Sequence, residues 1–213
     1  MIKDMKEQFT NTFKYNKWGC AESKSGIGSS LPYTVNFRKQ LVEIINKRSV
    51  ESIFDCSCGD WNWMGEIVSH LPQYVGNDIV QELIDQNNER YKSDSINFVC
   101  NDMLSQLKTY DDDQFDLVLC RHTLEHLPLD YCVEVVREIT RVSKYSIITS
   151  SQGNNIYNSE MTLDGFRSRQ IQLNQSPFVE MLGRPKEVFY DTVEEVDIKD
   201  IDNLPDTVYG FLF

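Results

Sequence analysis

Short apolar runs alternate with longer amphipathic stretches along the middle of the chain. The runs have the length of buried strands, and the stretches between them carry apolar residues at the spacing of one helical face. Repeated alternation of this kind is typical of a parallel sheet covered by helices on both faces. The predicted strands are 52–56, 73–78, 96–100, 115–120 and 145–150, and the predicted helices are 33–47, 62–71, 80–91 and 129–142.

The alternation ends near residue 151, where a polar and irregular segment begins. Two β-like runs at 187–190 and 208–213 close the sequence, and they predict a C-terminal antiparallel hairpin that completes a mostly parallel, seven-stranded sheet. A segment rich in Gly and Ser, 17–33, is predicted to be a loop. We expect a single domain over 1–213, made of an N-terminal lid and helix, a central core, and a substrate-facing segment with the hairpin (1–48, 49–151 and 152–213).

Length and composition are typical of one soluble globular domain, with 213 residues, 40% of them hydrophobic and 25% charged. The first ten residues are polar and lack the apolar stretch of a secretory signal. No run approaches the roughly 20 apolar residues of a membrane span. Six cysteines are scattered through the predicted core, without the spacing of a disulfide framework or a zinc site. We therefore expect a cytoplasmic protein that makes no membrane contact.

The chain is acidic, with 33 acidic and 21 basic residues and a net charge of −12. Affinity for nucleic acids rests largely on Lys and Arg side chains that meet phosphates. The composition therefore argues against a nucleic-acid partner, and it leaves the oligomeric state open.

In an open parallel sheet, ligands bind beyond the carboxyl ends of the strands. The first predicted strand runs into Asp55-Cys56-Ser57-Cys58-Gly59-Asp60-Trp61. This element resembles the first motif of class I S-adenosylmethionine-dependent methyltransferases, an acidic residue followed by a Gly-rich turn that lets backbone N–H groups approach the ligand. Ser57 and Trp61 replace two of the usual three glycines. The longer string, through Met64, resembles a narrower bacterial-type subset with the loop Cys-Gly-Asp-Phe-Asn-Trp-Met.

The resemblance implies a Rossmann-like class I methyltransferase fold with S-adenosyl-L-methionine as the cofactor. Residues 23–29 and Thr34 resemble the N-terminal lid of the subset. Asp78 matches the carboxylate that accepts hydrogen bonds from the ribose, and Asp102 matches the position near the adenine amino group; a helix cap or a turn is the alternative role for each. The expected cofactor contacts are Asp55, Ser57, Gly59, Asp78, Ile79, Asp102, Met103 and Arg121.

The fourth predicted strand runs into Arg121-His122-Thr123-Leu124-Glu125-His126, which holds two of the three histidines. His-x-x-Glu-His is also the inverted zincin pattern, but that site needs one helix through all five residues and a further ligand. The methyltransferase resemblance instead matches His126 to the histidine that faces the transferred methyl group. With a pKa near neutrality, His126 suits a general base. His122 would orient the acceptor, and capping or packing is the alternative for both histidines.

The ends of the fourth and fifth strands carry no cluster of carboxylates, so we expect a metal-independent reaction with no metal ligands. The leading hypothesis is O-methylation of a small polar acceptor, with a sugar hydroxyl of a glycan favoured. Arg121 is expected to pair with Glu125 or to grip a polar substrate. N- or C-methylation of another metabolite and a non-catalytic S-adenosylmethionine-binding protein are the alternatives. The candidate substrate-binding residues are Trp63, Glu125 and Arg167.

Overall fold

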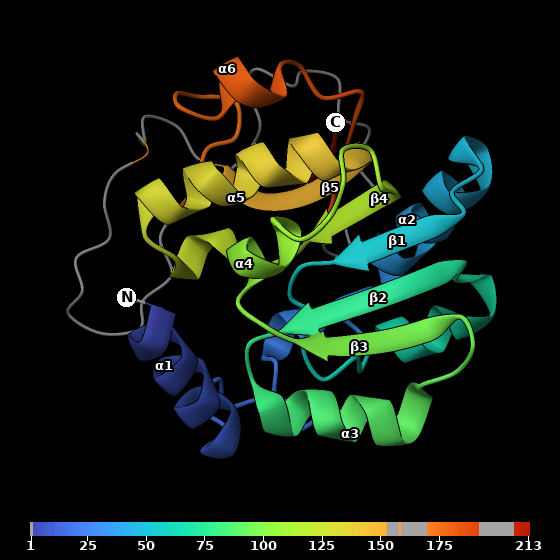
Figure 1. Cartoon of the computed structure of the whole chain (residues 1–213), viewed down its shortest axis with the longest axis vertical. Helices are drawn as coiled ribbons and strands as arrows, with labels where there is room; N and C mark the ends of the chain where they lie inside the picture. Colours follow the sequence, from blue (N-terminus) through green and yellow to red (C-terminus); the bar gives the residue numbers. More distant parts are fainter. Residues whose placement is uncertain (1, 153–157, 159–169, 192–206) are drawn as a thin grey trace.

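The computed structural model describes residues 2–152, 158, 170–191 and 207–213. These residues form a seven-stranded sheet in the order β3-β2-β1-β4-β5-β7-β6 (Figure 1). Every neighbouring pair from β3 to β5 is parallel, and β7 runs antiparallel to both β5 and β6. The predicted sheet is confirmed. The strands are β1 (Ser52–Asp55), β2 (Gln73–Asp78), β3 (Ile96–Cys100), β4 (Phe115–Cys120), β5 (Ser143–Gln152), β6 (Glu187–Tyr190) and β7 (Thr207–Leu212).

Successive residues of each central strand point to opposite faces of the sheet, and a separate apolar cluster lies on each face. Ile53 and Leu117 belong to one cluster, which is covered by α2 (Val35–Arg48), η2 (Met64–His70) and α3 (Gln81–Tyr91). Phe54 and Val118 belong to the other, which is covered by α4 (Met103–Leu107), α5 (Leu129–Val142) and α6 (Val179–Leu182). In the described part of the chain, no helix is both long and apolar enough to cross a membrane.

The N-terminal helix α1 (Ile2–Lys14) was not predicted from the sequence. It lies beside the carboxyl ends of β2 and β3, as Figure 1 shows. Met5 packs into the cluster on one face of the sheet and Phe13 into the cluster on the other, while Phe9 packs against both. The apolar residues recur every four positions, which is the signal that could have revealed the helix among its polar neighbours.

The stretch 62–71, predicted as an amphipathic helix, instead forms the 3₁₀ helix η2, with a break at Ile67. Trp61, just before it, has a positive φ of 56° and is 1% exposed. Its ring packs against Tyr74, Tyr91 and Phe98. The left-handed backbone at Trp61 is followed by a turn at residues 62–63, and the helical stretch begins only at Met64.

The order of the strands reverses between β1 and β4, because β2 and β3 continue on one side while β5 continues on the other. In open α/β sheets the crevice at such a reversal receives the ligand. The segments after Asp55 and Cys120 therefore begin at the place where a site is expected.

Gly210 in β7 lies opposite Phe189 in β6, and a Cβ at this position would come within 2.4 Å of the Phe189 ring. Because the ring is buried, Gly210→Ala forces it to move and should destabilise the fold by about 1–3 kcal/mol. Urea unfolding monitored by circular dichroism measures the loss. Gly65→Ala is the control, since its Cβ would make only ordinary contacts at 3.8 Å or more. Equal stability of the two variants would contradict the prediction.

Candidate active site

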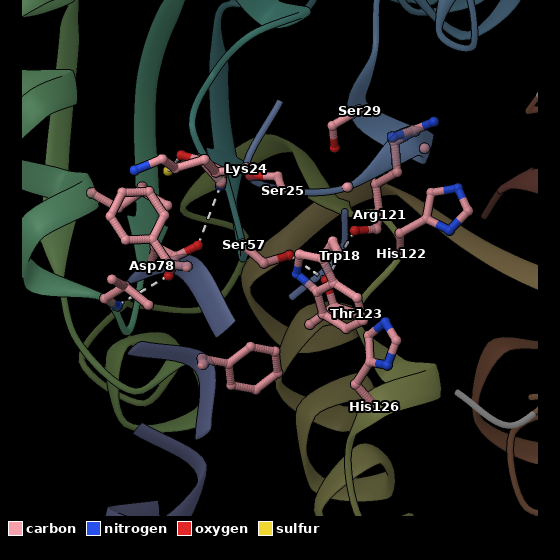
Figure 2. A pocket seen from close by; sticks show the side chains of 18 of the residues that line it. Trp18, Lys24, Ser25, Ser29, Ser57, Asp78, Arg121, His122, Thr123 and His126 are labelled. Atoms are coloured by element: carbon pink, nitrogen blue, oxygen red, sulfur yellow. Dashed lines mark hydrogen bonds between the residues drawn. The ribbon is translucent and has the colours of Figure 1, made fainter. Parts of the chain in front are cut away.

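Two neighbouring cavities open at the carboxyl ends of the strands. The larger, of about 370 Å³, is bounded by the loops after β1, β2 and β4 and by residues 24–29. The smaller, of about 60 Å³, shares four lining residues with it, namely Phe9, Ser57, Asp78 and Thr123. Figure 2 shows Asp78 on one side of the larger cavity and His122 and His126 on the other, with Ser57 and Trp18 between them.

The loop after β1 is held by its own aspartate. The Asp55 carboxylate accepts hydrogen bonds from Ser57 N at 3.3 Å and from the Tyr74 hydroxyl at 2.9 Å. Burial raises the pKa of Asp55 to about 6 in spite of these bonds. Gly59, with a φ of +57°, makes the turn that a side chain would strain. The Ser57 hydroxyl is paired with the Thr123 hydroxyl, which ties this loop to the one after β4.

Asp78, at the end of β2, lines both cavities. One of its carboxylate oxygens accepts a hydrogen bond from Gly59 N at 3.2 Å, and the other accepts one from Val80 N at 3.0 Å. Burial raises the pKa of Asp78 to about 6, against the effect of these backbone donors. The carboxylate thus joins the turn after β1 to the end of β2.

The smaller cavity is lined by the expected residues Ile79, Asp102 and Met103. The Asp102 carboxylate caps α4 by accepting from Ser105 N, and it also accepts a bond from the Tyr131 hydroxyl at 2.5 Å. The capping alternative is therefore realised in this structure, although Asp102 also borders the cavity. Met5 and Phe9 of α1 line it as well, and sequence reasoning missed both because it missed the helix.

The loop after β4 does not have the geometry of a zincin. His122 has a positive φ of 50°, and Glu125 and His126 lie in the three-residue turn η3 (Leu124–His126) and not in one helix with His122. Both ring nitrogens of His122 meet carboxylates: Nδ1 lies 3.1 Å from Glu125 Oε1, and Nε2 lies 2.9 Å from Asp191 Oδ2. Although burial of the ring opposes its charge, these two carboxylates raise the pKa of His122 to about 9.

His126 has a different electrostatic environment. Its ring lines the larger cavity and packs against Trp18, with the ring centroids 4.9 Å apart. Burial lowers the pKa of His126, and the nearby His122 charge acts in the same direction while Glu125 opposes it. At neutral pH, therefore, His126 is neutral and His122 carries a positive charge.

Arg121 pairs with Asp191, so the expected pairing with Glu125 was wrong. Its Nε and an Nη donate to the two Asp191 oxygens at 2.9 and 2.7 Å. The guanidinium also lies over the rings of Phe37 and Trp63, with its carbon 4.9 and 5.4 Å from their centroids. Arg121 and the candidate Trp63 both line the larger cavity. Sequence reasoning missed Asp191, which lies 70 positions after Arg121 and follows no recognisable motif.

The predicted lid covers the loop after β1. The Asp60 carboxylate accepts hydrogen bonds from the Ser23 hydroxyl and from Lys24 N, at 2.9 and 2.8 Å. Asp60 N in turn donates to the Ser25 hydroxyl at 2.9 Å. Further along the lid, Gly28 lies against the His122 ring. The segment therefore contacts the loops after both β1 and β4.

Arg167, the remaining candidate for substrate binding, lies outside the described residues. Within residues 2–152, 158, 170–191 and 207–213, no group of three or more His, Cys, Asp or Glu side chains is placed to hold a metal ion. Metal independence stays a prediction, which a chelator tests.

Residues 54–146 match the sequence model of a methyltransferase-domain family. A SAM-dependent methyltransferase from Archaeoglobus fulgidus is 18% identical, with a TM-score of 0.56 over 82% of this chain and 93% of that one. A SAM-dependent methyltransferase from Methanosarcina mazei is 16% identical, with a TM-score of 0.57 over 79% and 95% of the two chains. The methyltransferase domain of bacterial CtHen1 is 13% identical, with a TM-score of 0.58 over 83% and 96%. No curated protein sequence matches the chain.

These structural likenesses establish the fold, and the family model covers the core from β1 into β5. The core of the chain, residues 54–146, thus matches a methyltransferase domain, and the described residues share the fold of S-adenosylmethionine-dependent methyltransferases. The methyltransferase resemblance drawn from Asp55, Gly59 and Asp78 is thereby confirmed at the level of the class.

The cofactor of this methyltransferase is S-adenosylmethionine, and the cavities fit it. The tight turn at Gly59 is so closely packed that a Cβ there would come within 2.5 Å of the Ser25 hydroxyl oxygen. The half-buried Asp78 carboxylate lines both cavities and offers acceptors for ribose hydroxyls, and Met5, Phe9 and Met103 give the smaller cavity an apolar lining. His126 lines the larger cavity on the side opposite Asp78, as Figure 2 shows.

Replacement of Asp78 should weaken cofactor binding. Asp78→Ala removes an acceptor worth about 1–3 kcal/mol, so the affinity for S-adenosylhomocysteine should fall roughly five- to a hundredfold. Calorimetry measures the affinity, and circular dichroism checks that the variant is folded. Asp94→Ala, an exposed aspartate before β3, is the control. Unchanged affinity in folded Asp78→Ala protein would reject the assignment.

The affinity for S-adenosylhomocysteine should also depend on pH. Burial raises the pKa of Asp78 from 3.8 to about 6, so its ionisation destabilises the folded apo protein progressively between these two pH values and fully above about pH 6. Hydrogen bonds donated by the ribose stabilise the ionised form, so binding should be stronger at pH 7 than at pH 5. Asp78→Asn should flatten this dependence and leave only the part that is due to Asp55. A native affinity that is the same at both pH values would contradict the assignment.

The lid should exchange its amide hydrogens more slowly when the cofactor product is bound. Because residues 23–29 contact the loops after β1 and β4, S-adenosylhomocysteine should protect them in hydrogen-exchange mass spectrometry. Asp60→Ala removes the acceptor of Ser23 and Lys24, so it should speed exchange there in the free protein. Protection confined to the Gly59 loop would show that the segment is no lid.

Proposed function

We propose that this methyltransferase transfers a methyl group to a hydroxyl oxygen of a small polar acceptor, with a sugar hydroxyl of a glycan the favoured case and His126 the general base. The observation that carries the proposal is the lowered pKa of His126 at the acceptor end of the larger cavity. A neutral imidazole can accept the proton of a hydroxyl, whereas the charged imidazole of His122 cannot.

The charges around the acceptor end favour an uncharged acceptor. Arg121 and His122 bring two positive charges, and Asp191 and Glu125 bring two negative charges in direct contact with them. A phosphate or carboxylate on the acceptor would require unpaired cationic donors. Among the described lining residues, Lys24 is the one other cation.

The aromatic residues of the larger cavity support a sugar as the acceptor. Trp18, Tyr33 and Trp63 line it together with the polar side chains, and Tyr33 is 42% exposed. A cavity that combines flat apolar surfaces with a few polar groups suits a ring that has an apolar face and hydroxyl edges. Arg167, Trp63 and Glu125 are the residues that we propose as acceptor contacts.

S-adenosylmethionine supplies an electrophilic methyl group on a sulfonium sulfur. With both reactants bound, the acceptor oxygen would displace sulfur at the methyl carbon, and His126 would take the hydroxyl proton. The products are a methyl ether and S-adenosylhomocysteine, and His126 later releases its proton to water. Alignment of oxygen, carbon and sulfur is the main demand, which the protein meets by holding both reactants at fixed positions.

We also propose that the enzyme works in a reducing compartment, the cytoplasm. None of the six cysteines, all of which lie in the described residues, forms a disulfide, and five of them are buried. Burial raises the pKa of Cys58 well above its usual value, so its thiol is unreactive.

His126→Ala should retain cofactor binding but lose turnover about 10²–10⁴-fold, which is the usual contribution of a positioned base. The measurement is transfer of radiolabelled methyl to a panel of sugars, nucleosides and phenols. His122→Ala should lose less, because both nitrogens of His122 are engaged by carboxylates. The exposed His70 at the end of η2 provides the control, His70→Ala.

Near-normal turnover of His126→Ala would rule out its role as the base. A chelator should leave the native rate intact; activity that is abolished by chelator and restored by Mg²⁺ or Mn²⁺ would overturn metal independence. Methylation of an amine or a carbon acceptor in place of any hydroxyl would favour the N- or C-methyltransferase alternative.

A further inference from the structure

We propose that Asp191 is a positioning residue for the acceptor site: through His122 it holds Glu125 ready to bind a hydroxyl of the acceptor. This inference rests on the proposed function, because it concerns how the same acceptor is recognised. Asp191 lies outside the sequence motifs described above, and it would act on the acceptor through the His122 ring and Glu125.

The geometry is a continuous chain of contacts. Asp191 follows β6 and is fully buried, and its Oδ2 lies 2.9 Å from His122 Nε2. The other nitrogen of the same ring, Nδ1, lies 3.1 Å from Glu125 Oε1. A single imidazole therefore bridges two carboxylates, one at 0% side-chain exposure and the other at 17%. The more exposed of the two, Glu125, lines the larger cavity.

His122 cannot bind the acceptor through its ring nitrogens, because both are already engaged. Its backbone is fixed as well, since His122 N donates to the Thr149 hydroxyl at 2.8 Å. Glu125, by contrast, is held by His122 through Oε1, and its side chain lines the larger cavity and is 17% exposed. The acceptor contact thus belongs to Glu125, while His122 and Asp191 determine where its carboxylate lies.

The charge on His122 makes the chain of contacts effective. Burial alone would lower the pKa of His122, but Asp191 and Glu125 raise it to about 9. Burial alone would raise the pKa of Asp191, but Arg121 and His122 lower it to about 2. His126 is the other titratable group facing this cluster, and its pKa is lowered. At neutral pH both bonds of the His122 ring are therefore charge-assisted.

Loss of the His122 proton would break one of these two bonds, since a neutral imidazole has one N–H donor. Because the pKa of His122 is raised, the charged ring stabilises the folded state fully at pH values below its unfolded-state pKa of ~6.5. This stabilisation is lost as the pH rises through about 9. Acceptor binding by Glu125 should weaken over the same alkaline range, while cofactor binding at the other end of the cavity should not.

Asp191→Asn tests the proposal in the full chain. It keeps the size of the side chain but removes the charge that faces His122 and Arg121. The pKa of His122, measured by NMR titration of the imidazole, should fall in this variant, so that the ring loses its proton at a proton concentration at least tenfold higher than in the native protein. The chain has three histidines, so the signals can be assigned by single substitutions. The control is Asp116→Asn, which removes a carboxylate on β4 that pairs with Lys144 away from the cavity.

Kinetics provide the second readout, with methyl α-glycosides from the sugar panel as acceptors. The KM for the acceptor should rise about tenfold in Asp191→Asn with a smaller change in kcat, and the alkaline limb of kcat/KM should move to lower pH. The affinity for S-adenosylhomocysteine should stay within twofold of the native value. If Asp191→Asn does not fold, Glu125→Gln tests the other end of the bridge and should also lower the pKa of His122.

The two failures are distinguishable. If no sugar is methylated, the proposed acceptor is wrong, but the NMR titration still tests the bridge. If His122 titrates unchanged in folded Asp191→Asn, or if the acceptor KM and the alkaline limb stay native, the positioning role is overturned. An equal loss of cofactor affinity and acceptor affinity would likewise overturn it, because it would indicate a general structural effect.

Discussion

The buried ion pair between Arg121 and Asp191 is the interaction on which the proposed acceptor end of the site depends. The two side chains are 5% and 0% exposed, so either charge alone would be strongly disfavoured. Two hydrogen bonds join them, and the rings of Phe37 and Trp63 lie against the guanidinium. The pair connects the residue after β4 to the residue after β6. It thereby fixes His122, which follows Arg121 directly and meets the same carboxylate.

Because Asp191 of this pair also contacts His122, the two histidines His122 and His126, which are only four positions apart, differ in protonation. His122 lies between two carboxylates and carries a charge, whereas His126 lies against Trp18 in a less polar environment and stays neutral. A single neutral histidine beside the cavity gives the proposed reaction one base. The charged one balances the carboxylates around it, so an uncharged acceptor meets no uncompensated charge at that end.

Much of the fold could be predicted from the sequence, because strands and helices with a clear apolar period owe their form to local pattern. β2, β3, β4, β6 and α5 have the predicted bounds. The prediction failed at η2, which follows the buried Trp61 with its left-handed backbone, and at α1, where four apolar residues are dispersed among polar ones. At the site, Asp55 and Asp78 could be found because they follow strands. Asp191 could not, since its role depends on a contact across the sheet that no spacing reveals.

The cofactor end of the cavity holds the opposite kind of electrostatics, with two carboxylates that burial makes reluctant to ionise. The rise in the pKa of Asp55 and of Asp78 from 3.8 to about 6 corresponds to roughly 3 kcal/mol for each group at neutral pH. This free energy disfavours the empty fold, and hydrogen-bond donors on a ligand can recover it. Binding that stabilises the native state in this way also raises its resistance to unfolding. The unfavourable burial at the first two strand ends is thus a reason for the site to bind a ligand rich in hydroxyl and amino groups, and S-adenosylmethionine has both.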